Sequence, residues 1–345
     1  MDKDTIKRLI IEYQQFAANI TLIEREIHLS HQLNYVFVGL RRAGKSYLMY
    51  QQIQSLLNDG HQPEEILYFN FEDDRLVNLT VEDLDLIKVS YEELYPHKPI
   101  FFLDEIQIVE HWEKFARRLA DQQYRVYITG SNAKMLSAEI ATTLGGRYIV
   151  QNVYPFSFSE FLKASKIEIG PTWYYKNRTE IVRTFSDYFS YGGLPELMLI
   201  ETIEKRQWLS NLFNKIFFGD LITRYSIRND LAMKVLIRKL AESVKQPSSF
   251  NRLTNIVSTT GAKVSTDTII DYLNFLQATW LFFSLENYAS KLVEKISNRK
   301  YYFIDNGLLN LFLIDPVTSL LENIVAISLK KKYEEEPVSY THLRA

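Results

Sequence analysis

The stretch Asn34–Tyr47, which reads NYVFVGLRRAGKSY, decides the fold of this chain. It opens with an apolar run typical of a buried strand and continues through Gly39, four further residues, Gly44, Lys45 and Ser46. This spacing, between a strand and the start of a helix, is the pattern of a phosphate-binding P-loop. The glycines let the backbone approach the phosphates, its N–H groups form an anion nest, and the helix adds the positive end of its dipole.

The residue types in this loop predict nucleotide binding. The lysine of a P-loop reaches the β- and γ-phosphates, and the hydroxyl after it takes a place on Mg²⁺. The alternative is a glycine turn without a ligand. The side chains of Arg41 and Arg42 could face either solvent or nucleotide. The predicted ligands of the nucleotide are Gly39, Leu40, Arg41, Arg42, Ala43, Gly44, Lys45, Ser46 and Tyr47.

Composition excludes several classes of protein. The chain has 345 residues, enough for two or three domains, and its 46% apolar and 24% charged residues are ordinary for a globular protein. It has no cysteine, which excludes disulfides and thiolate chemistry and fits a cytoplasmic location. The charged, helix-like start has no apolar core of signal-peptide type, and no run approaches the ~20 apolar residues of a membrane span, so we expect neither segment. The net charge of −2 identifies no partner.

A second motif follows a later apolar run, Ile100–Leu103. The two residues directly after this run are Asp104 and Glu105, and an apolar run followed by two acids is the arrangement of a Walker B strand. At the end of such a strand Asp104 would hold the Mg²⁺ shell, and Glu105 would orient and deprotonate the attacking water. We expect hydrolysis, with a switch that only binds nucleotide as the alternative.

Polar residues after the next strand suggest a sensor. The strand Arg125–Ile128 leads into Thr129-Gly130-Ser131-Asn132. Asn132 or Ser131 could touch the γ-phosphate or the attacking water, or could instead cap the helix that follows.

Two further charged residues are candidates for the site. Arg147, after two glycines, could reach phosphate in its own chain, act as a finger toward a neighbouring subunit, or be a surface residue after a helix end. Glu72 ends the second strand near the phosphate edge of the sheet, where it could have a polar role.

The order of patterns predicts an α/β fold. A helix is expected over residues 4–28, and apolar strands then alternate with helices, which implies a parallel sheet covered on both faces. We assign residues 1–155 to this domain, 156–225 to a helical lid, 226–297 to a winged-helix-like domain and 298–336 to a further α/β segment.

The 226–297 region reads as a helix-turn-helix followed by a strand-like wing. Its nine basic and six acidic residues give a net charge of +3. A winged helix binds either DNA or protein, and a net charge this small does not distinguish the two kinds of partner. Asp267 and Asp271 on the expected recognition helix weaken the DNA interpretation.

Taken together, these segments resemble a family of prokaryotic AAA-superfamily ATPases with a winged helix and a C-terminal PD-(D/E)XK nuclease-like domain. The resemblance covers residues 30–332 and is carried by GLRRAGKS, YFNFEDDRL, FFLDEIQ, YITGSNAKML, LGGRY, YPFSFSEFL, YGGLPELM, YYFIDNGLLN and LLENIVAISL. It implies ATP at the P-loop, Mg²⁺ and hydrolysis at Asp104 and Glu105, and sensing near Ser131–Asn132. Oligomers are possible.

The C-terminus departs from that family pattern. Glu322 would be the helix acid of a nuclease site, but the later acidic and lysine residues are missing, so packing at a helix start is its expected role. Residues 337–345 (PVSYTHLRA) fit no element and read as a non-native tail, so we expect a longer natural protein without nuclease activity in this chain.

Overall fold

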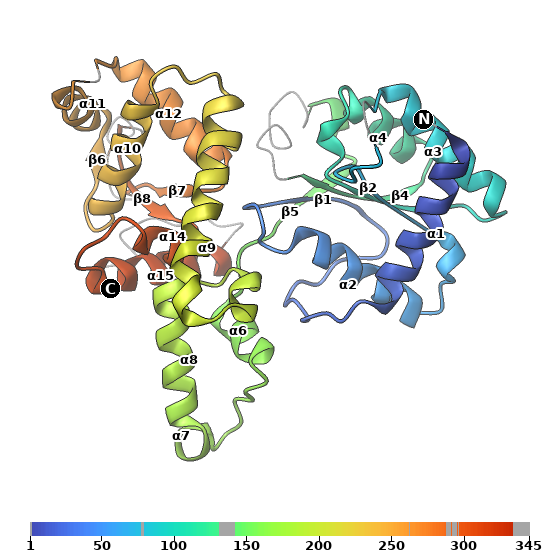
Figure 1. Cartoon of the computed structure of the whole chain (residues 1–345), viewed down its shortest axis with the longest axis horizontal. Coiled ribbons are helices and arrows are strands. Elements are labelled where there is room, and N and C mark those ends of the chain that lie inside the picture. The colour runs from blue at the N-terminus through green and yellow to red at the C-terminus, as the bar shows by residue number, and fades with distance from the viewer. Residues whose placement is uncertain are drawn as a thin grey trace. The chain divides into compact units, whose positions relative to one another are not determined.

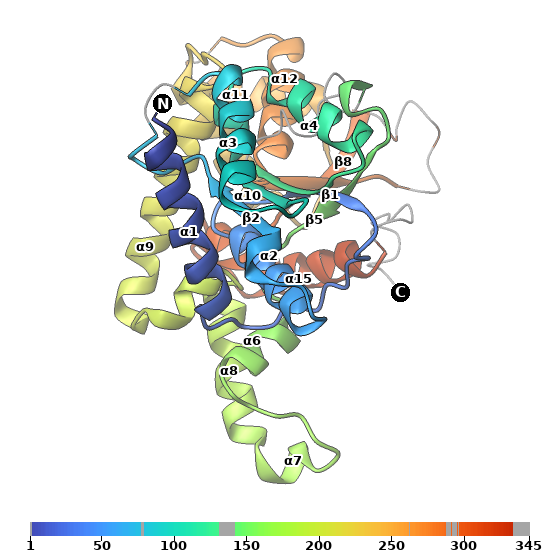
Figure 2. The same ribbon diagram turned by 90° about the vertical axis from the view of Figure 1, so that its right-hand side faces the viewer.

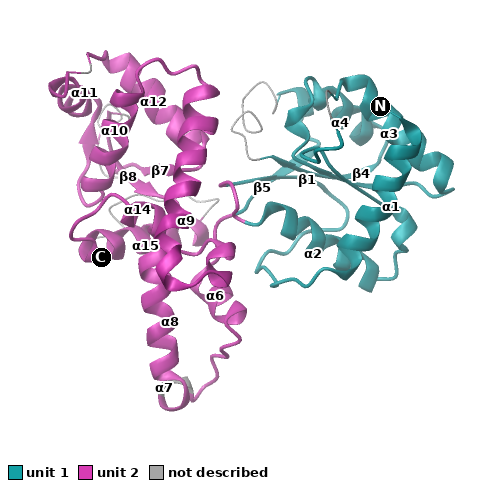
Figure 3. Cartoon of the chain, viewed as in Figure 1, with its two compact units in different colours: residues 1–39, 44–153 teal, residues 40–43, 154–345 magenta. Residues whose placement is uncertain are grey.

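The computed structural model describes residues 2–76, 79–130, 142–261, 263–287, 291, 295 and 297–333. The chain divides into two compact units (Figure 3). Unit 1 comprises residues 1–39 and 44–153, and unit 2 comprises residues 40–43 and 154–345. The tip of the glycine-rich loop therefore groups with the second unit.

Unit 1 is built on a five-stranded sheet in the order β2-β3-β4-β1-β5, and every strand pair in it is parallel. The predicted α/β fold with a parallel sheet is confirmed. The strands are β1 (Asn34–Val38), β2 (Ile66–Asn70), β3 (Ile100–Asp104), β4 (Arg125–Gly130) and β5 (Tyr148–Asn152).

Helices cover both faces of this sheet (Figure 1). In unit 1, α3 and α4 lie on one face, α2 lies on the other, and α1 packs along the edge strand β2. Short 3₁₀ turns, η1 (Pro63–Glu65) and η2 (Ile106–Ile108), join some of the elements. The helices are α1 (Lys3–Asn19), α2 (Lys45–Asn58), α3 (Val81–Leu94) and α4 (Trp112–Asp121).

The first helix is shorter than predicted. The expected helix over residues 4–28 ends at Asn19, and Ile20 is already extended. The amide of Gln54 on α2 donates to the carbonyls of Ala17 and Ile20, at 3.2 and 2.8 Å. This tertiary contact satisfies carbonyl groups at the helix end, where no further helical turn is available to do so.

The central strands are buried on both faces, which explains their continuous apolar runs. All five residues of β3 are buried, and the rings of Phe102 and Tyr127 on neighbouring strands stack with centroids 4.5 Å apart. Because the strands are parallel, Val38, Asp104 and Gly130 end at one edge of the sheet. That edge receives the loop after β1.

Unit 2 begins with helices. In Figure 2, α7 and most of α8 form an arm that projects from the rest of the unit. The elements are α6 (Phe158–Ala164), α7 (Trp173–Lys176), α8 (Arg178–Tyr191), η4 (Pro195–Leu199), α9 (Thr202–Lys215) and the π-helix η5 (Ile216–Thr223).

Three helices and a small antiparallel sheet follow in unit 2. The sheet has the order β6-β8-β7. In chain order the elements are α10 (Asp230–Glu242), β6 (Ser248–Ser249), α11 (Phe250–Thr259), α12 (Thr266–Ala278), β7 (Phe282–Leu285) and β8 (Asn298–Phe303), and α14 (Asn306–Asn310) and α15 (Val317–Lys332) come last.

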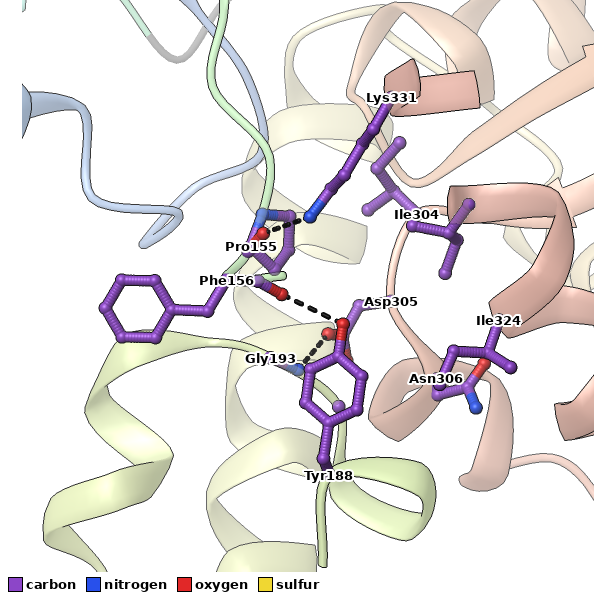
Figure 4. Close-up of a pocket in the computed structure, with 11 residues that line it drawn as sticks. Pro155, Phe156, Tyr188, Gly193, Ile304, Asp305, Asn306, Ile324 and Lys331 are labelled. Carbon is purple, nitrogen blue, oxygen red and sulfur yellow. Dashed lines mark hydrogen bonds between the residues drawn. The ribbon is translucent and has the colours of Figure 1, made fainter. Parts of the chain in front are cut away.

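A buried carboxylate joins distant segments of unit 2 (Figure 4). Asp305, which caps α14, accepts backbone N–H groups from Gly193 at 2.8 Å and from Gly307 at 2.9 Å. Gly192 has φ +83°, and a Cβ there would lie 2.1 Å from the Asp305 carboxylate. Beside it, Lys331 donates to the carbonyl of Pro155 at 2.6 Å. Gly192 is thus required by close approach of the Asp305 side chain, and Gly193 by the carbonyl of Phe156, which would lie 2.4 Å from its Cβ.

Glu322 near the start of α15 is an ion-pair partner and more than a packing residue. Its Oε1 accepts from Lys300 Nζ at 2.6 Å and from the Tyr302 hydroxyl at 3.0 Å. Lys300 lies on β8 and is only 4% exposed. Glu322 therefore neutralises a buried lysine. The tail, residues 337–345, lies outside the described residues.

Candidate functional site

Two positions of the loop after β1 require glycine. A Cβ on Gly39 would lie 2.1 Å from the carbonyl oxygen of Val153, so no larger residue fits. Gly44 precedes α2 with φ +94°, a left-handed conformation that favours glycine. Lys45 is buried and its Nζ donates to the carbonyl of Gly39 at 3.3 Å. Leu40 and Ala43 are fully buried, while Tyr47 is half exposed.

Asp104 lies at the carboxyl end of β3, only 2% exposed, among hydroxyl groups. Tyr68 donates to its Oδ2 at 2.6 Å and Thr129 donates to its Oδ1, and the Ser46 side chain lies close enough to lower its pKa. Burial raises the pKa of Asp104, these hydroxyls lower it, and the charge of Glu105 raises it. The sheet thus brings together the two residues predicted to bind metal, Ser46 and Asp104.

These groups fit a magnesium ion. A carboxylate and a serine hydroxyl are hard oxygen donors, the type that Mg²⁺ prefers. A buried carboxylate that is disfavoured by desolvation also gains from a nearby cation. Ser46 and Asp104 are the residues of this chain that would hold it.

Glu105 adopts a strained backbone conformation. Its φ of 56° and ψ of 38° lie in the left-handed region, which is uncommon outside glycine. Its backbone N–H donates to Thr129 Oγ1 at 2.9 Å, and its side chain accepts a hydrogen bond from Gln107. Such strain persists where surrounding contacts impose it, often at functional sites.

The side chains of both loop arginines form ion pairs, and that of Arg42 is also 40% exposed to solvent. A contact of either with nucleotide stays a prediction. Arg41 forms a two-point ion pair with Asp220, with Nε–Oδ2 and Nη2–Oδ1 distances of 3.1 and 3.3 Å. Arg42 pairs with Glu196 and lies 5.6 Å from the ring of Trp208. Both side chains therefore contact residues of unit 2.

Arg147 is not brought to the loop within this chain. It precedes β5, at the end of the strand where Tyr148 pairs with Asn34, whereas the loop follows Val38 at the opposite end. Its side chain pairs with Asp121 and donates to the carbonyl of Gly145 at 3.3 Å. A role toward a neighbouring subunit stays a prediction.

The other polar candidates differ in position. Glu72 lies two residues beyond β2, whose last residue Asn70 pairs with Asp104, and its side chain is exposed. Its polar role stays a prediction. Ser131 and Asn132 lie outside the described residues.

Thr129 and Tyr68 are site residues that the sequence did not single out. Thr129 is fully buried and contacts both Asp104 and Glu105. Tyr68 also hydrogen-bonds Tyr50, at 2.9 Å between hydroxyl oxygens, and burial raises its pKa well above the ordinary value. A signal existed for Thr129, because it is a polar residue next to the end of β4, the strand beside β3.

Comparison with known proteins agrees with this geometry. Residues 32–162 match a family described as an AAA domain, and residues 182–318 match a domain of unknown function, DUF8612. The chain is 33% identical over 336 residues to the uncharacterized protein MJ1544 of Methanocaldococcus jannaschii, spanning 96% of this chain and 74% of that protein. The chain belongs to this family of AAA-domain proteins.

The AAA-domain chain is also similar to a further sequence and to a solved structure. An uncharacterized Haemophilus influenzae protein is 32% identical, and the match covers 90% of this chain and 79% of that one. The Walker-type ATPase PABY2304 of Pyrococcus abyssi aligns in structure with a TM-score of 0.48 and 11% identity, covering 90% of this chain and 95% of that one. Among the described residues of the AAA-domain chain, no helix has the length and apolarity needed to cross a membrane.

Proposed function

We propose that this AAA-domain protein binds ATP with Mg²⁺ and hydrolyses it. The observation that carries the proposal is that the Ser46 side chain lies close enough to the buried Asp104 carboxylate to lower its pKa, beside the glycine loop. This places the hydroxyl of one motif beside the carboxylate of the other, as a metal–nucleotide site requires.

The roles of the side chains follow from their chemistry. The loop N–H groups and Lys45 would bind the phosphates, and bound Mg²⁺ would supply positive charge that offsets the charge of their oxygens. Glu105 would hold the attacking water and take its proton. Thr129 holds the backbone of Glu105 through the 2.9 Å hydrogen bond.

Replacement of Glu105 by Gln tests the hydrolysis step. The change removes the base and keeps the shape, so we expect ATP binding to persist while single-turnover hydrolysis with Mg²⁺ falls by roughly 10²-fold or more. Equal hydrolysis rates in wild type and variant would show that Glu105 is not the base. Hydrolysis too slow to detect in wild type, with ATP still bound, would favour a nucleotide-gated docking protein.

We further propose that hydrolysis moves a C-terminal module. Support comes from residues 230–303, whose element order and β6-β8-β7 sheet are those expected of a winged helix. The exposed positions of α12 include Asp267, Asp271 and Asn274. Acidic groups on that helix repel DNA phosphates, so we favour a protein partner for the module.

A further inference from the structure

A rare backbone conformation marks the segment Ile216–Thr223. Its eight residues, IFFGDLIT, form a π-helix, which appears in short pieces and frequently at functional sites. The segment contains one acidic residue, Asp220, and that residue is only 5% exposed. A buried carboxylate in this setting is costly unless it is paired.

Asp220 pairs with the tip of the phosphate-binding loop. Arg41 contacts both carboxylate oxygens, at 3.1 and 3.3 Å, and its side chain is 20% exposed. Residues 40–43 belong to unit 2, so this pair lies within one compact unit. Two-point arginine–carboxylate pairs fix orientation as well as distance.

A second arginine shares the same carboxylate. Arg224 lies four residues after Asp220, and its Nη2 is 3.1 Å from Oδ1. The Nη1 of Arg224 is buried without a hydrogen-bond partner in the described part of the chain. Two guanidinium groups thus face one carboxylate, which holds the Asp220 side chain against Arg41.

From these contacts we infer that Asp220 is a positioning residue for ATP binding, acting through Arg41. The inference rests on the proposed function. Arg42 has φ +64° and Gly44 has φ +94°, so this part of the loop is neither helix nor strand and needs other contacts to hold its shape. An anchored Arg41 keeps the loop in one conformation before ATP arrives, which lowers the ordering cost of binding.

The neighbouring pair provides a comparison within the same loop. Arg42 and Glu196 have side chains 40% and 43% exposed, against 20% and 8% for Arg41 and Asp220. Exposed ion pairs contribute little because solvent screens them. We therefore assign the anchoring effect to Asp220.

A double-mutant cycle on ATP affinity tests the inference. The dissociation constant for ATP is measured for wild type, Asp220→Asn, Arg41→Ala and the double variant, with Asp230→Asn as the matched control. Asp230 is an exposed acid paired with Lys234 on α10. We expect each single change at Asp220 or Arg41 to weaken ATP binding about tenfold, and the double variant to be no weaker than Arg41→Ala. The turnover number of Asp220→Asn at saturating ATP should stay within about twofold of wild type.

Several outcomes would overturn this assignment. They are unchanged affinity in Asp220→Asn, tighter binding in it, or fully additive losses in the double variant. If Asp220→Asn unfolds, Asp220→Glu is measured in its place. We then expect its ATP affinity to be near that of wild type, because a carboxylate remains to pair with Arg41. If wild type itself does not bind ATP, the proposed function is wrong. If wild type and Asp220→Asn bind ATP equally well, only the role of Asp220 is wrong.

Discussion

Thr129 connects the two acidic residues of the site. Its hydroxyl donates to Asp104 and accepts the backbone N–H of Glu105 at 2.9 Å. One hydroxyl therefore orients the proposed metal ligand and holds the proposed base in its left-handed conformation. Groups that orient metal ligands in this way commonly change metal affinity 10–100-fold when they are removed.

Valine has nearly the volume of threonine but lacks the hydroxyl, so Thr129→Val should remove the hydrogen bonds to both Asp104 and Glu105. We expect the Mg²⁺ concentration for half-maximal hydrolysis to rise about tenfold, and the free energy of unfolding to fall by about 1–3 kcal/mol because a buried N–H loses its partner. Hydrolysis measured over a Mg²⁺ titration checks this, and Thr129→Ser, which keeps the hydroxyl, is the control. An unchanged Mg²⁺ dependence in Thr129→Val would refute the role.

At the scale of elements, the cap of α14 holds unit 2 together. Asp305 accepts N–H groups from its own helix and from Gly193 after α8. Burial raises the pKa of Asp305 to about 6, although these N–H groups and the charge of Lys331 lower it. The cavity beside it is small, about 10 Å³, so little water reaches the carboxylate.

This buried acid makes a prediction about pH. The folded pKa of Asp305, about 6, exceeds the ordinary 3.8, so between those values the folded state binds more protons than the unfolded state. The contribution of Asp305 to stability is therefore full below about pH 4 and falls by about 3 kcal/mol as the pH rises to about 6.

Urea unfolding of wild type and Asp305→Asn across this pH range measures that contribution. The unfolding free energy of wild type should fall relative to that of Asp305→Asn as the pH rises from about 4 to 6. A difference that is constant with pH would mean that Asp305 does not titrate in this window.

At the scale of the whole molecule, surface charge on α12 tests the partner proposed for the C-terminal module. The exposed side of α12 carries Asp267 and Asp271. We expect wild type to show no binding to duplex DNA at ~50 mM salt, since phosphate contacts need basic groups. Replacing both aspartates by Lys should create binding that weakens as salt is raised. Salt-dependent DNA binding by wild type would contradict the preference for a protein partner.

The sequence by itself determined the sheet and the two motifs of the site. Continuous apolar runs predict buried parallel strands, and the spacing from Gly39 to Ser46 and the Asp104–Glu105 pair predict the loop and the end of β3. These features could be read because each depends on residues a few positions apart.

Only the tertiary structure decided which side chains surround those motifs. Arg41 pairs with Asp220, which is 179 residues away in the sequence. Asp104 hydrogen-bonds Tyr68 and Thr129, which are 36 and 25 residues away. Lys300 on β8 likewise pairs with Glu322 on α15. At the end of α1, the Gln54 amide on α2 donates to the carbonyl of Ile20. The physical reason is that local spacing encodes strands and loops, whereas a hydrogen bond between distant residues exists only once the elements have packed.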